Sequence, residues 1–220
     1  AVGDSNPAIL YMTNDYGSGL ADNFQANWSG SVCTTNAYDP TEGSYDASTI
    51  AQSVIDGGCD SALLVSYATD GAAIVEALRG QGFEGTIFGA DGIADAAFAE
   101  AFTDASAVDG IVATKPKPGD ASTAQSTFNS AYSAAGGDAE GIYTHETYDA
   151  VKIIAKAATA DEDANLRDDI GKVGTGYDGA SGVHTFDSNG DVAGTGYEVC
   201  DFAPSFTCTR VWTAESGLSN

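Results

Sequence analysis

The stretch SALLVSYATDGAAIVEALRGQGFEGTIFG, residues 61–89, contains the pattern that decides the fold. Its first segment, Ser61–Ser66, is apolar in the middle, as in a strand that is buried on both faces of a parallel sheet. Asp70 is the expected N-cap of a helix that runs to Gly80. A second short strand is expected at Thr86–Gly89. A strand, a helix and a strand in this order predict a βαβ unit, in which the two strands are parallel.

The same alternation continues on both sides of this unit. The additional expected strands are Pro7–Thr13, Ser31–Ala37 and Gly110–Thr114, and the additional expected helices are Ser18–Trp28, Ala47–Asp56 and Ala94–Phe102. Strands that alternate with helices in this way build a parallel sheet with helices on both faces. Residues 1–113 are therefore predicted to form a doubly wound α/β lobe.

The pattern changes after this lobe. Lys115–Asp120 contains two prolines and a glycine, which prevent a helix and favour a connector between lobes. Three helices are then expected, at Ala121–Ala135, Thr144–Ala160 and Asn165–Val173. Residues 183–199 are predicted to form a hairpin with a tight turn at Asn189–Gly190, and a final strand is expected through Trp212.

Composition limits the classes of partner. The 220 residues include 32 Asp+Glu against 8 Lys+Arg, so the formal net charge is −24. Such a negative field repels the phosphates of nucleic acids and anionic membrane surfaces, which excludes both as partners. The acidity has two interpretations: adaptation to a saline habitat, where salt screens the self-repulsion, or an ordinary acidic secreted protein. The scarcity of basic residues and the dispersed acids favour the saline habitat.

The cysteines bear on the cellular compartment. Cys33, Cys59, Cys200 and Cys208 form an even set without a CxxC pair, and the chain has only two histidines, so a zinc site is poorly supported. Cys200 and Cys208 flank a short loop between two strand-like runs, which suits a disulfide across a hairpin. Cys33 and Cys59 each adjoin a strand and could pair if these strands are neighbours. Two disulfides would indicate an oxidising compartment outside the cytoplasm; the alternative is four buried free thiols.

Three residues that could hold a ligand stand just beyond the carboxyl ends of expected strands: Tyr16, Tyr67 and Asp91. In open parallel α/β sheets, ligands bind at this edge, and the winding of βαβ units would bring the three residues together. A carboxylate there can pair with a ligand ammonium, and tyrosine rings can cover an apolar body. The alternatives are a turn or helix-capping role for Asp91 and edge packing for each tyrosine. The flanking candidates are Ala68, Thr69 and Ala90.

No pattern typical of an enzyme, a metal site or a cofactor site is visible in the sequence. His145 and His184 have no cysteine, and no serine in a nucleophile setting, near them, so they are interpreted as a helix-start residue and a strand residue. Asp187, Asn189 and Asp191 resemble the start of a calcium loop, but the glycine that follows falls at the wrong position, and a hairpin turn is favoured. The chain is therefore predicted to be non-enzymatic and to need no metal or cofactor.

Six stretches form a series that is more specific than any one of them. In chain order they are YMTNDYGSGLADNF, GGCDSALLVSYATDGAAIVEALRGQG, TIFGADG, DGIVATKP, TYDAVKIIAKAA and FDSNGDV. In this order and at this spacing, from about residue 8 to residue 200, they resemble the type I periplasmic binding proteins, specifically the branched-chain amino acid (leucine/isoleucine/valine) branch of the ABC-transporter receptors.

The resemblance implies two α/β lobes that are joined by crossover strands and close on a ligand. Residues 1–113 and 195–215 would form the second lobe, and residues 114–194 would be the returning, mainly helical part of the first. Members of the family are longer, and the missing front part forms most of the first lobe's sheet. The expected fold is therefore one doubly wound lobe, an incomplete second lobe of helices, and a terminal β-hairpin.

The resemblance also implies a function: an extracytoplasmic solute-binding protein, periplasmic or at the cell surface, that binds an amino acid or a similar small solute and delivers it to a membrane ABC permease. By this resemblance, Tyr16 and Tyr67 stand at ligand-binding positions, and Asp91 stands where the ammonium-binding acid is found. The alternative is a ligand-sensing, assembly or structural module of the same fold with no transport role. Apolar helix faces after residue 120 would otherwise be exposed, so association with the missing N-terminal segment or with another copy is expected.

Overall fold

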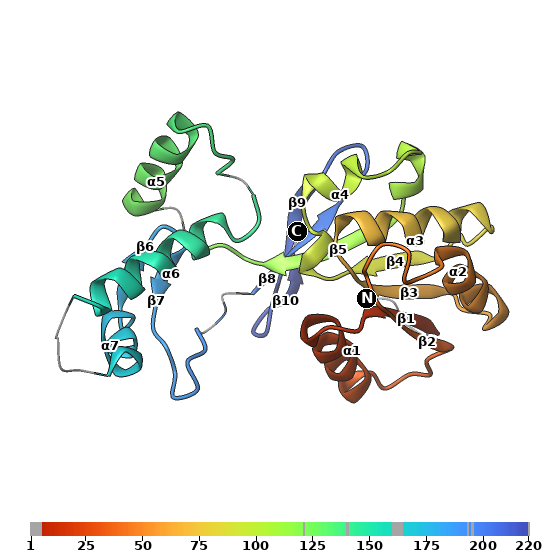
Figure 1. The fold of residues 1–220 in the computed structure, drawn as a ribbon, viewed down its shortest axis with the longest axis horizontal. Coiled ribbons are helices and arrows are strands. Elements are labelled where there is room, and N and C mark those ends of the chain that lie inside the picture. Colours follow the sequence, from red (N-terminus) through yellow and green to blue (C-terminus); the bar gives the residue numbers. More distant parts are fainter. Residues whose placement is uncertain are drawn as a thin grey trace. The chain divides into compact units, whose positions relative to one another are not determined.

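The computed structural model of the protein describes residues 6–120, 122–139, 141–159, 165–192, 194 and 196–219. The chain forms two compact units, which are labelled by their elements in Figure 1. Unit 1 consists of Ala1–Lys115 with Tyr197–Asn220, and unit 2 consists of Pro116–Gly196.

Unit 1 is built on an eight-stranded sheet with the strand order β10-β9-β8-β5-β4-β3-β1-β2. The strands are β1 (Pro7–Met12), β2 (Thr34–Tyr38), β3 (Ser61–Val65), β4 (Thr86–Gly89), β5 (Ile111–Pro116), β8 (Tyr197–Asp201), β9 (Thr207–Thr213) and β10 (Gly217–Ser219). Strands β1 to β5 pair in parallel, whereas β8, β9 and β10 pair antiparallel. The predicted parallel sheet and terminal hairpin are confirmed.

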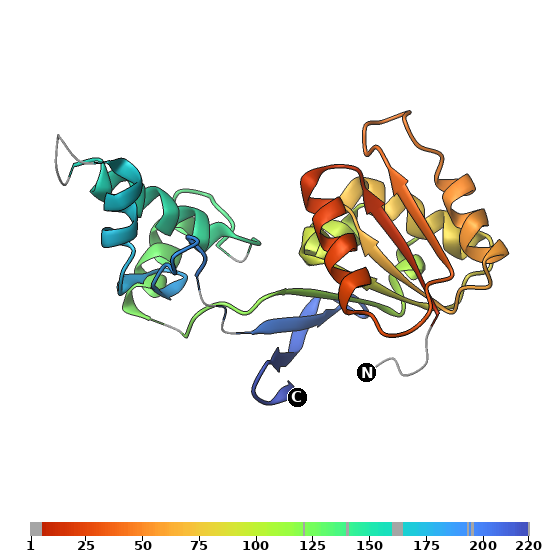
Figure 2. The same ribbon diagram turned by 90° about the horizontal axis from the view of Figure 1, so that it is seen from below.

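The helices of unit 1 cover both faces of this sheet. They are α1 (Asp15–Asn27), α2 (Ala47–Asp56), α3 (Ala68–Gly80) and α4 (Ala96–Glu100), with the 3-10 helices η1 (Asp91–Ile93) and η2 (Ala105–Val108). Helix α1 lies on one face, and α2, α3 and α4 lie on the other (Figures 1 and 2). Right-handed crossovers require this arrangement, because the chain moves outward from β1 to β2 and then returns across β1 to β3. The doubly wound arrangement is therefore confirmed.

The core of unit 1 surrounds the central strands. Successive side chains of a strand point to opposite faces, and both Ile9 and Leu10 are fully buried, so the sheet is covered on both faces at β1. Leu64 in β3 and Ile87 in β4 are also fully buried. Each such side chain stabilises the fold by about 1.5–3 kcal/mol through removal of apolar surface from water.

Helix α3 begins earlier than predicted, and Asp70 is not its N-cap. The helix starts at Ala68, so Tyr67 occupies the N-cap position and Asp70 lies in the first turn. The carboxylate of Asp70 nevertheless serves the helix end, because its Oδ2 accepts a hydrogen bond from the backbone N–H of Tyr67 at 3.4 Å. A negative charge in the first turn also interacts favourably with the positive end of the helix dipole.

The segment that was predicted as one helix over residues 94–102 forms η1 and the short α4 instead. Asp95 separates the two because its side chain accepts a hydrogen bond from the backbone N–H of Ala97 at 2.9 Å, as an N-cap does. The backbone at an N-cap is extended rather than helical, so a continuous helix cannot pass through Asp95.

Both predicted disulfides are present, Cys33–Cys59 and Cys200–Cys208. The second bridge joins paired residues of β8 and β9, as expected for a hairpin. The expectation that Cys33 and Cys59 pair only if their strands are neighbours is wrong, because β1 lies between β2 and β3. Cys33 and Cys59 precede β2 and β3, and their Cα atoms approach to 5.5 Å beyond the start of β1.

Unit 2 contains α5 (Thr123–Ala134), α6 (Thr144–Ala157), α7 (Leu166–Val173), and the antiparallel strands β6 (Tyr177–Gly179) and β7 (Gly182–His184). Ala121 and Ala160, the predicted outer ends of two helices, lie outside the described residues, as does Thr195.

The predicted hairpin over residues 183–199 is wrong. Strand β7 pairs with β6, and β8 pairs with β9, so the two arms of the expected hairpin belong to different sheets. A single bridge between Phe186 and Val192 closes the turn. The carboxylate of Asp187 accepts hydrogen bonds from the backbone N–H groups of Asn189 and Asp191, so this segment curls into a compact turn.

Candidate functional site

The candidate site lies at one edge of the sheet of unit 1, where β1, β3 and β4 end. Because these strands are parallel, the segments that follow them meet at the same edge. The strand order also reverses between β1 and β3, and such a switch point opens a crevice at the carboxyl ends of the strands. The three predicted ligand-binding residues follow these three strands, one each.

Tyr16 occupies the first turn of α1, which is held close to the end of β1. Asn14 caps the helix by accepting the N–H of Gly17 at 2.8 Å. Gly17 is required there, because a Cβ atom at this position would lie 2.0 Å from the carbonyl oxygen of Met12. The short link places the Tyr16 hydroxyl beside η1, where it donates to Oδ1 of Asp91 at 2.9 Å and accepts the N–H of Gly92 at 2.8 Å.

Tyr67 completes the arrangement from the other side of the switch point. Its ring stacks on that of Tyr16, with a centroid distance of 5.7 Å and planes within 5° of parallel. About half of Tyr67 (50%) remains exposed, so the stack presents an aromatic surface to solvent. The structure thus brings Tyr16, Tyr67 and Asp91 together, and Asp91 is the first residue of η1 rather than its cap.

The flanking candidates lie on the same segments. Ala68 and Thr69 form the start of α3, directly after Tyr67. Ala90 joins β4 to η1, and its backbone N–H donates to the carbonyl of Leu64 at the end of β3. Thr69 is exposed, while Ala68 and Ala90 are half-buried.

A buried pair that the sequence did not reveal supports this edge. The hydroxyl of Tyr38, at the end of β2, donates to Oδ2 of Asp70 at 2.5 Å. Burial, together with the neighbouring negative charge of Asp70, raises the pKa of Tyr38, so the phenol stays protonated and remains a donor. Asp70 in turn accepts the N–H of Tyr67, so the pair fixes the segment that carries this ring.

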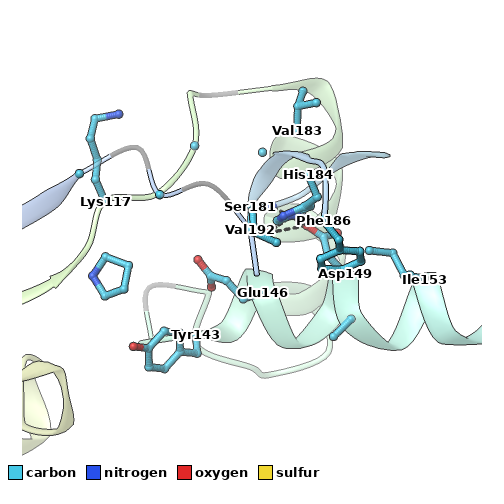
Figure 3. A pocket seen from close by; sticks show the side chains of 16 residues that line it. Lys117, Tyr143, Glu146, Asp149, Ile153, Ser181, Val183, His184, Phe186 and Val192 are labelled. Atoms are coloured by element: carbon cyan, nitrogen blue, oxygen red, sulfur yellow. Dashed lines mark hydrogen bonds and ion pairs between the residues drawn. The ribbon is translucent and has the colours of Figure 1, made fainter. Parts of the chain in front are cut away.

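Unit 2 contains a second polar cluster, beside a cavity of about 350 Å³ (Figure 3). Asp149 of α6 is 1% exposed and accepts hydrogen bonds from the backbone N–H groups of Ala180 and Ser181 and from the Ser181 hydroxyl. Nε2 of His184 lies 2.8 Å from the Ser181 hydroxyl and 3.3 Å from Asp149. Burial alone would raise the pKa of Asp149, but the hydrogen bonds from Ser181, Ala180 and His184 lower it below its usual value.

This cluster does not have the geometry of a hydrolytic triad. In a triad the acid binds one ring nitrogen of the histidine and the serine binds the other. Here Ser181 and Asp149 approach the same nitrogen of His184, and the serine hydroxyl donates directly to the carboxylate. Its evident role is to fasten the β6–β7 turn onto α6. The sequence interpretation of His184 as a simple strand residue missed these partners, because Asp149 lies 35 positions away.

The only described cluster with metal-ligand chemistry is Glu198 with Cys200 and Cys208. Both sulfur atoms belong to a disulfide, so they are not thiolate ligands.

Comparisons with known proteins give a consistent result. A sequence model of the family described as periplasmic binding protein matches residues 1–200. No curated protein sequence matches the chain. None of the helices among the described residues has the length and apolar character needed to cross a membrane.

Several solved structures share the fold at low sequence identity. A putative branched-chain amino acid ABC transporter protein from Rhodospirillum rubrum is 22% identical, with a TM-score of 0.69, over 94% of this chain and 61% of its own. The leucine binding protein LivK from Thermotoga maritima is 19% identical, with a TM-score of 0.77, over 96% and 61%. The substrate binding protein LivJ from Streptococcus pneumoniae, in complex with isoleucine, is 19% identical, with a TM-score of 0.71, over 93% and 61%. The chain therefore spans about three fifths of the length of these proteins.

Proposed function

We propose, from the premise that this chain belongs to the periplasmic binding protein family, that it is an extracytoplasmic solute-binding protein of an ABC-type uptake system. Its ligand is an amino acid with an apolar side chain, of the branched-chain type, or a similar small solute. The Thermotoga maritima protein is named a leucine binding protein, and the Streptococcus pneumoniae protein was solved in complex with isoleucine. Both observations support this ligand class. The partner is a membrane permease that receives the solute.

The observation that carries this proposal is the meeting of two stacked tyrosines and a carboxylate at the switch point of the sheet. Asp91 pairs with the ligand ammonium, and a charge-assisted hydrogen bond of this kind contributes about 1.5–3 kcal/mol. The rings of Tyr16 and Tyr67 cover the apolar side chain of the ligand. The flanking residues Ala68, Thr69 and Ala90 line the same edge, and the two alanines leave room for the ligand.

Unit 1 supplies one wall of the binding site in this proposal. We assign residues 1–113 and 195–215 to the second lobe of the family and residues 114–194 to the returning part of the first. The chain spans about three fifths of the length of its solved relatives. The second candidate function is therefore a sensing, assembly or structural module of the same fold. No described cluster supports an enzymatic reaction, and the relatives are binding proteins.

Location follows from the same premise and from two further features. The family is extracytoplasmic, and the two disulfides are compatible with an oxidising compartment. The net charge of −24 supports a saline habitat, where salt screens the repulsion between the acidic residues.

Titration calorimetry with leucine, isoleucine and valine in concentrated salt tests the proposal. We expect Asp91→Asn to weaken binding by about 10–100-fold, which corresponds to the loss of one charge-assisted hydrogen bond. Asp22→Asn removes the same charge from an exposed position on α1 and should leave the affinity unchanged. Equal affinities of the Asp91 variant and the wild type would remove Asp91 from the site. Absence of binding by all three amino acids would favour the structural module.

A further inference from the structure

The end of α1 contains the tripeptide Asn27–Trp28–Ser29, which has the form of an acceptor for N-linked glycans. Such a motif requires a hydroxyl group two positions after the asparagine and any residue except proline between them. No other asparagine of the sequence is followed by this pattern. A tripeptide of this kind also occurs by chance, so the structure around it decides whether it can be used.

The structure presents this tripeptide to solvent. Asn27 is the last residue of α1, and both Asn27 and Ser29 are exposed. The helical backbone ends here, because Trp28 is the C-cap residue and is extended, with φ −81° and ψ 120°. Residues 28–33 belong to no helix or strand. A modifying enzyme can therefore reach the tripeptide in the folded protein.

The side-chain amide of Asn27 can lose one hydrogen without losing its contact in the structure. Its Nδ2 donates a hydrogen bond to the backbone carbonyl of Asn23 at 2.8 Å. An asparagine amide carries two N–H donors, and only one of them is needed for this bond. A sugar can therefore replace the other hydrogen while the bond to Asn23 remains.

The surroundings of Asn27 suit a sugar. The rings of Phe24 and Trp28 stack beside it, with a centroid distance of 5.2 Å and planes 18° apart. Phe24 precedes Asn27 by three positions and so lies on the same side of the helix. Aromatic rings of this kind can cover the apolar face of a sugar ring. No charged residue occurs between Asp22 and Asp39, although the protein carries 32 acidic residues, so this exposed segment offers neutral polar groups instead.

We propose that Asn27 is a site of N-linked glycosylation, with an oligosaccharide on a polyprenyl phosphate carrier as the donor. In the transfer, Nδ2 of Asn27 forms a bond to C1 of the first sugar, and the bond between C1 and the phosphate oxygen of the carrier breaks. The carrier leaves with the electron pair of that bond, and the amide nitrogen releases one proton. Nothing is oxidised or reduced. The inference rests on the extracytoplasmic location in the proposed function, because this modification belongs to exported proteins.

The glycan would lie far from the candidate ligand site. Tyr16 is in the first turn of α1, about 16 Å from Asn27 along the helix axis. The loop after Asn27 is held where the strands begin, because the backbone N–H of Cys33 donates to the carbonyl of Pro7 at 3.1 Å and Cys33 is bridged to Cys59. We therefore expect Asn27→Gln to leave the affinity for amino acids unchanged, so failure to bind an amino acid and failure to carry a glycan are separate results.

Mass spectrometry of the secreted protein tests the proposal. The chain is expressed in a salt-tolerant host whose own exported proteins carry N-linked glycans. After reduction of the disulfides, a protease that cleaves before aspartate releases residues 22–38, which include Asn23, Asn27 and Asn36. We expect this peptide to be heavier by the mass of an oligosaccharide, and fragmentation to place the added mass on Asn27.

Substitutions identify the acceptor. Asn27→Gln and Ser29→Ala should each cause loss of the modified peptide, whereas Ser29→Thr keeps the hydroxyl group and should retain it. Asn23→Gln is the matched control, because Asn23 is exposed on the same helix and donates to the carbonyl of Gly19 at 2.8 Å, as Asn27 does to Asn23. This control should keep the glycan.

Two results would overturn the proposal. One is an unmodified peptide from the wild-type protein, and the other is a glycan that survives Asn27→Gln or Ser29→Ala. If a variant is not secreted, the position of the added mass in the wild-type peptide still decides.

Discussion

Asp149 shows how one buried carboxylate can hold two distant segments together. It lies in α6, and it accepts hydrogen bonds from two consecutive backbone N–H groups of the β6–β7 turn, at Ala180 and Ser181. Gly179 is needed beside it, because a Cβ atom there would lie 2.2 Å from the carboxylate. Only the ionised form offers acceptors to all of these donors, so the contact stabilises the fold most when Asp149 is charged.

The lowered pKa of Asp149 therefore predicts a pH-dependent contribution to stability. Because the pKa is lower in the folded than in the unfolded protein, the stabilisation is complete above the ordinary aspartate pKa of about 3.9 and is lost as the pH falls through the lowered value. We expect Asp149→Asn to reduce the free energy of unfolding at pH 7, and the difference from wild type to shrink below about pH 4.

Urea unfolding at several pH values measures this difference. Asp178→Asn removes the same charge from an exposed position on β6 and serves as the control. A difference between the Asp149 variant and wild type that stays constant from pH 7 down to pH 3 would show that the carboxylate charge does not stabilise the turn.

At this scale the sequence predicted some contacts and missed others for a clear reason. Tyr16, Tyr67 and Asp91 each follow a strand of a recognisable βαβ series, so chain winding alone predicted that they meet. Tyr38 and Asp70 pair across 32 positions by side-chain packing, for which the sequence contains no periodic signal.

At the scale of elements, the junction between β1 and α1 positions the candidate site. Gly17 allows the helix to begin against the carbonyl of Met12, where no side chain fits. We expect Gly17→Ala to destabilise unit 1 by about 2 kcal/mol or more, because the helix must shift away from the strand and carry Tyr16 with it. Thermal and urea unfolding measure the effect.

Gly19 provides the matched control for this prediction. It lies in the same helix, and no atom is within 4 Å of the position its Cβ would take. Gly19→Ala should stabilise the protein by about 0.5–1 kcal/mol, because alanine loses less conformational entropy in a helix. Similar effects of the two substitutions would show that the close contact at Gly17 is unimportant.

Elements with strong periodicity were predictable, and their ends were set by side chains that the pattern does not encode. Helix α2 was predicted with its observed bounds, because Gly57–Gly58 follows it directly. The prediction of one helix over residues 94–102 was wrong because Asp95 caps a new helix. The prediction of a hairpin over residues 183–199 was wrong because its two arms pair with β6 and β9. A local alternation of apolar and polar residues does not reveal such long-range pairing.

At the scale of the whole molecule, the dominant feature is charge. A net charge of −24 on 220 residues opposes compaction, because acidic groups are closer together in the folded than in the unfolded chain. The screening length is about 10 Å at 0.1 M salt and about 3 Å at 1 M, so added salt removes most of this repulsion between exposed groups.

We therefore expect the melting temperature to rise with potassium chloride between 0.1 and 1 M. A gain of about 2 kcal/mol in the free energy of unfolding would correspond to a rise of about 4–8 °C in melting temperature for a chain of this size.

A variant with fewer charges separates screening from general salt effects on apolar surface, because only screening depends on the net charge. Suitable exposed acids for replacement by amides are Asp22, Glu42, Glu100, Asp168, Asp178 and Glu215. Since repulsion grows with the square of the net charge, this variant should be more stable at low salt and should respond less to salt. An unchanged salt response would show that the acidic surface does not limit stability, and would leave the saline habitat without physical support.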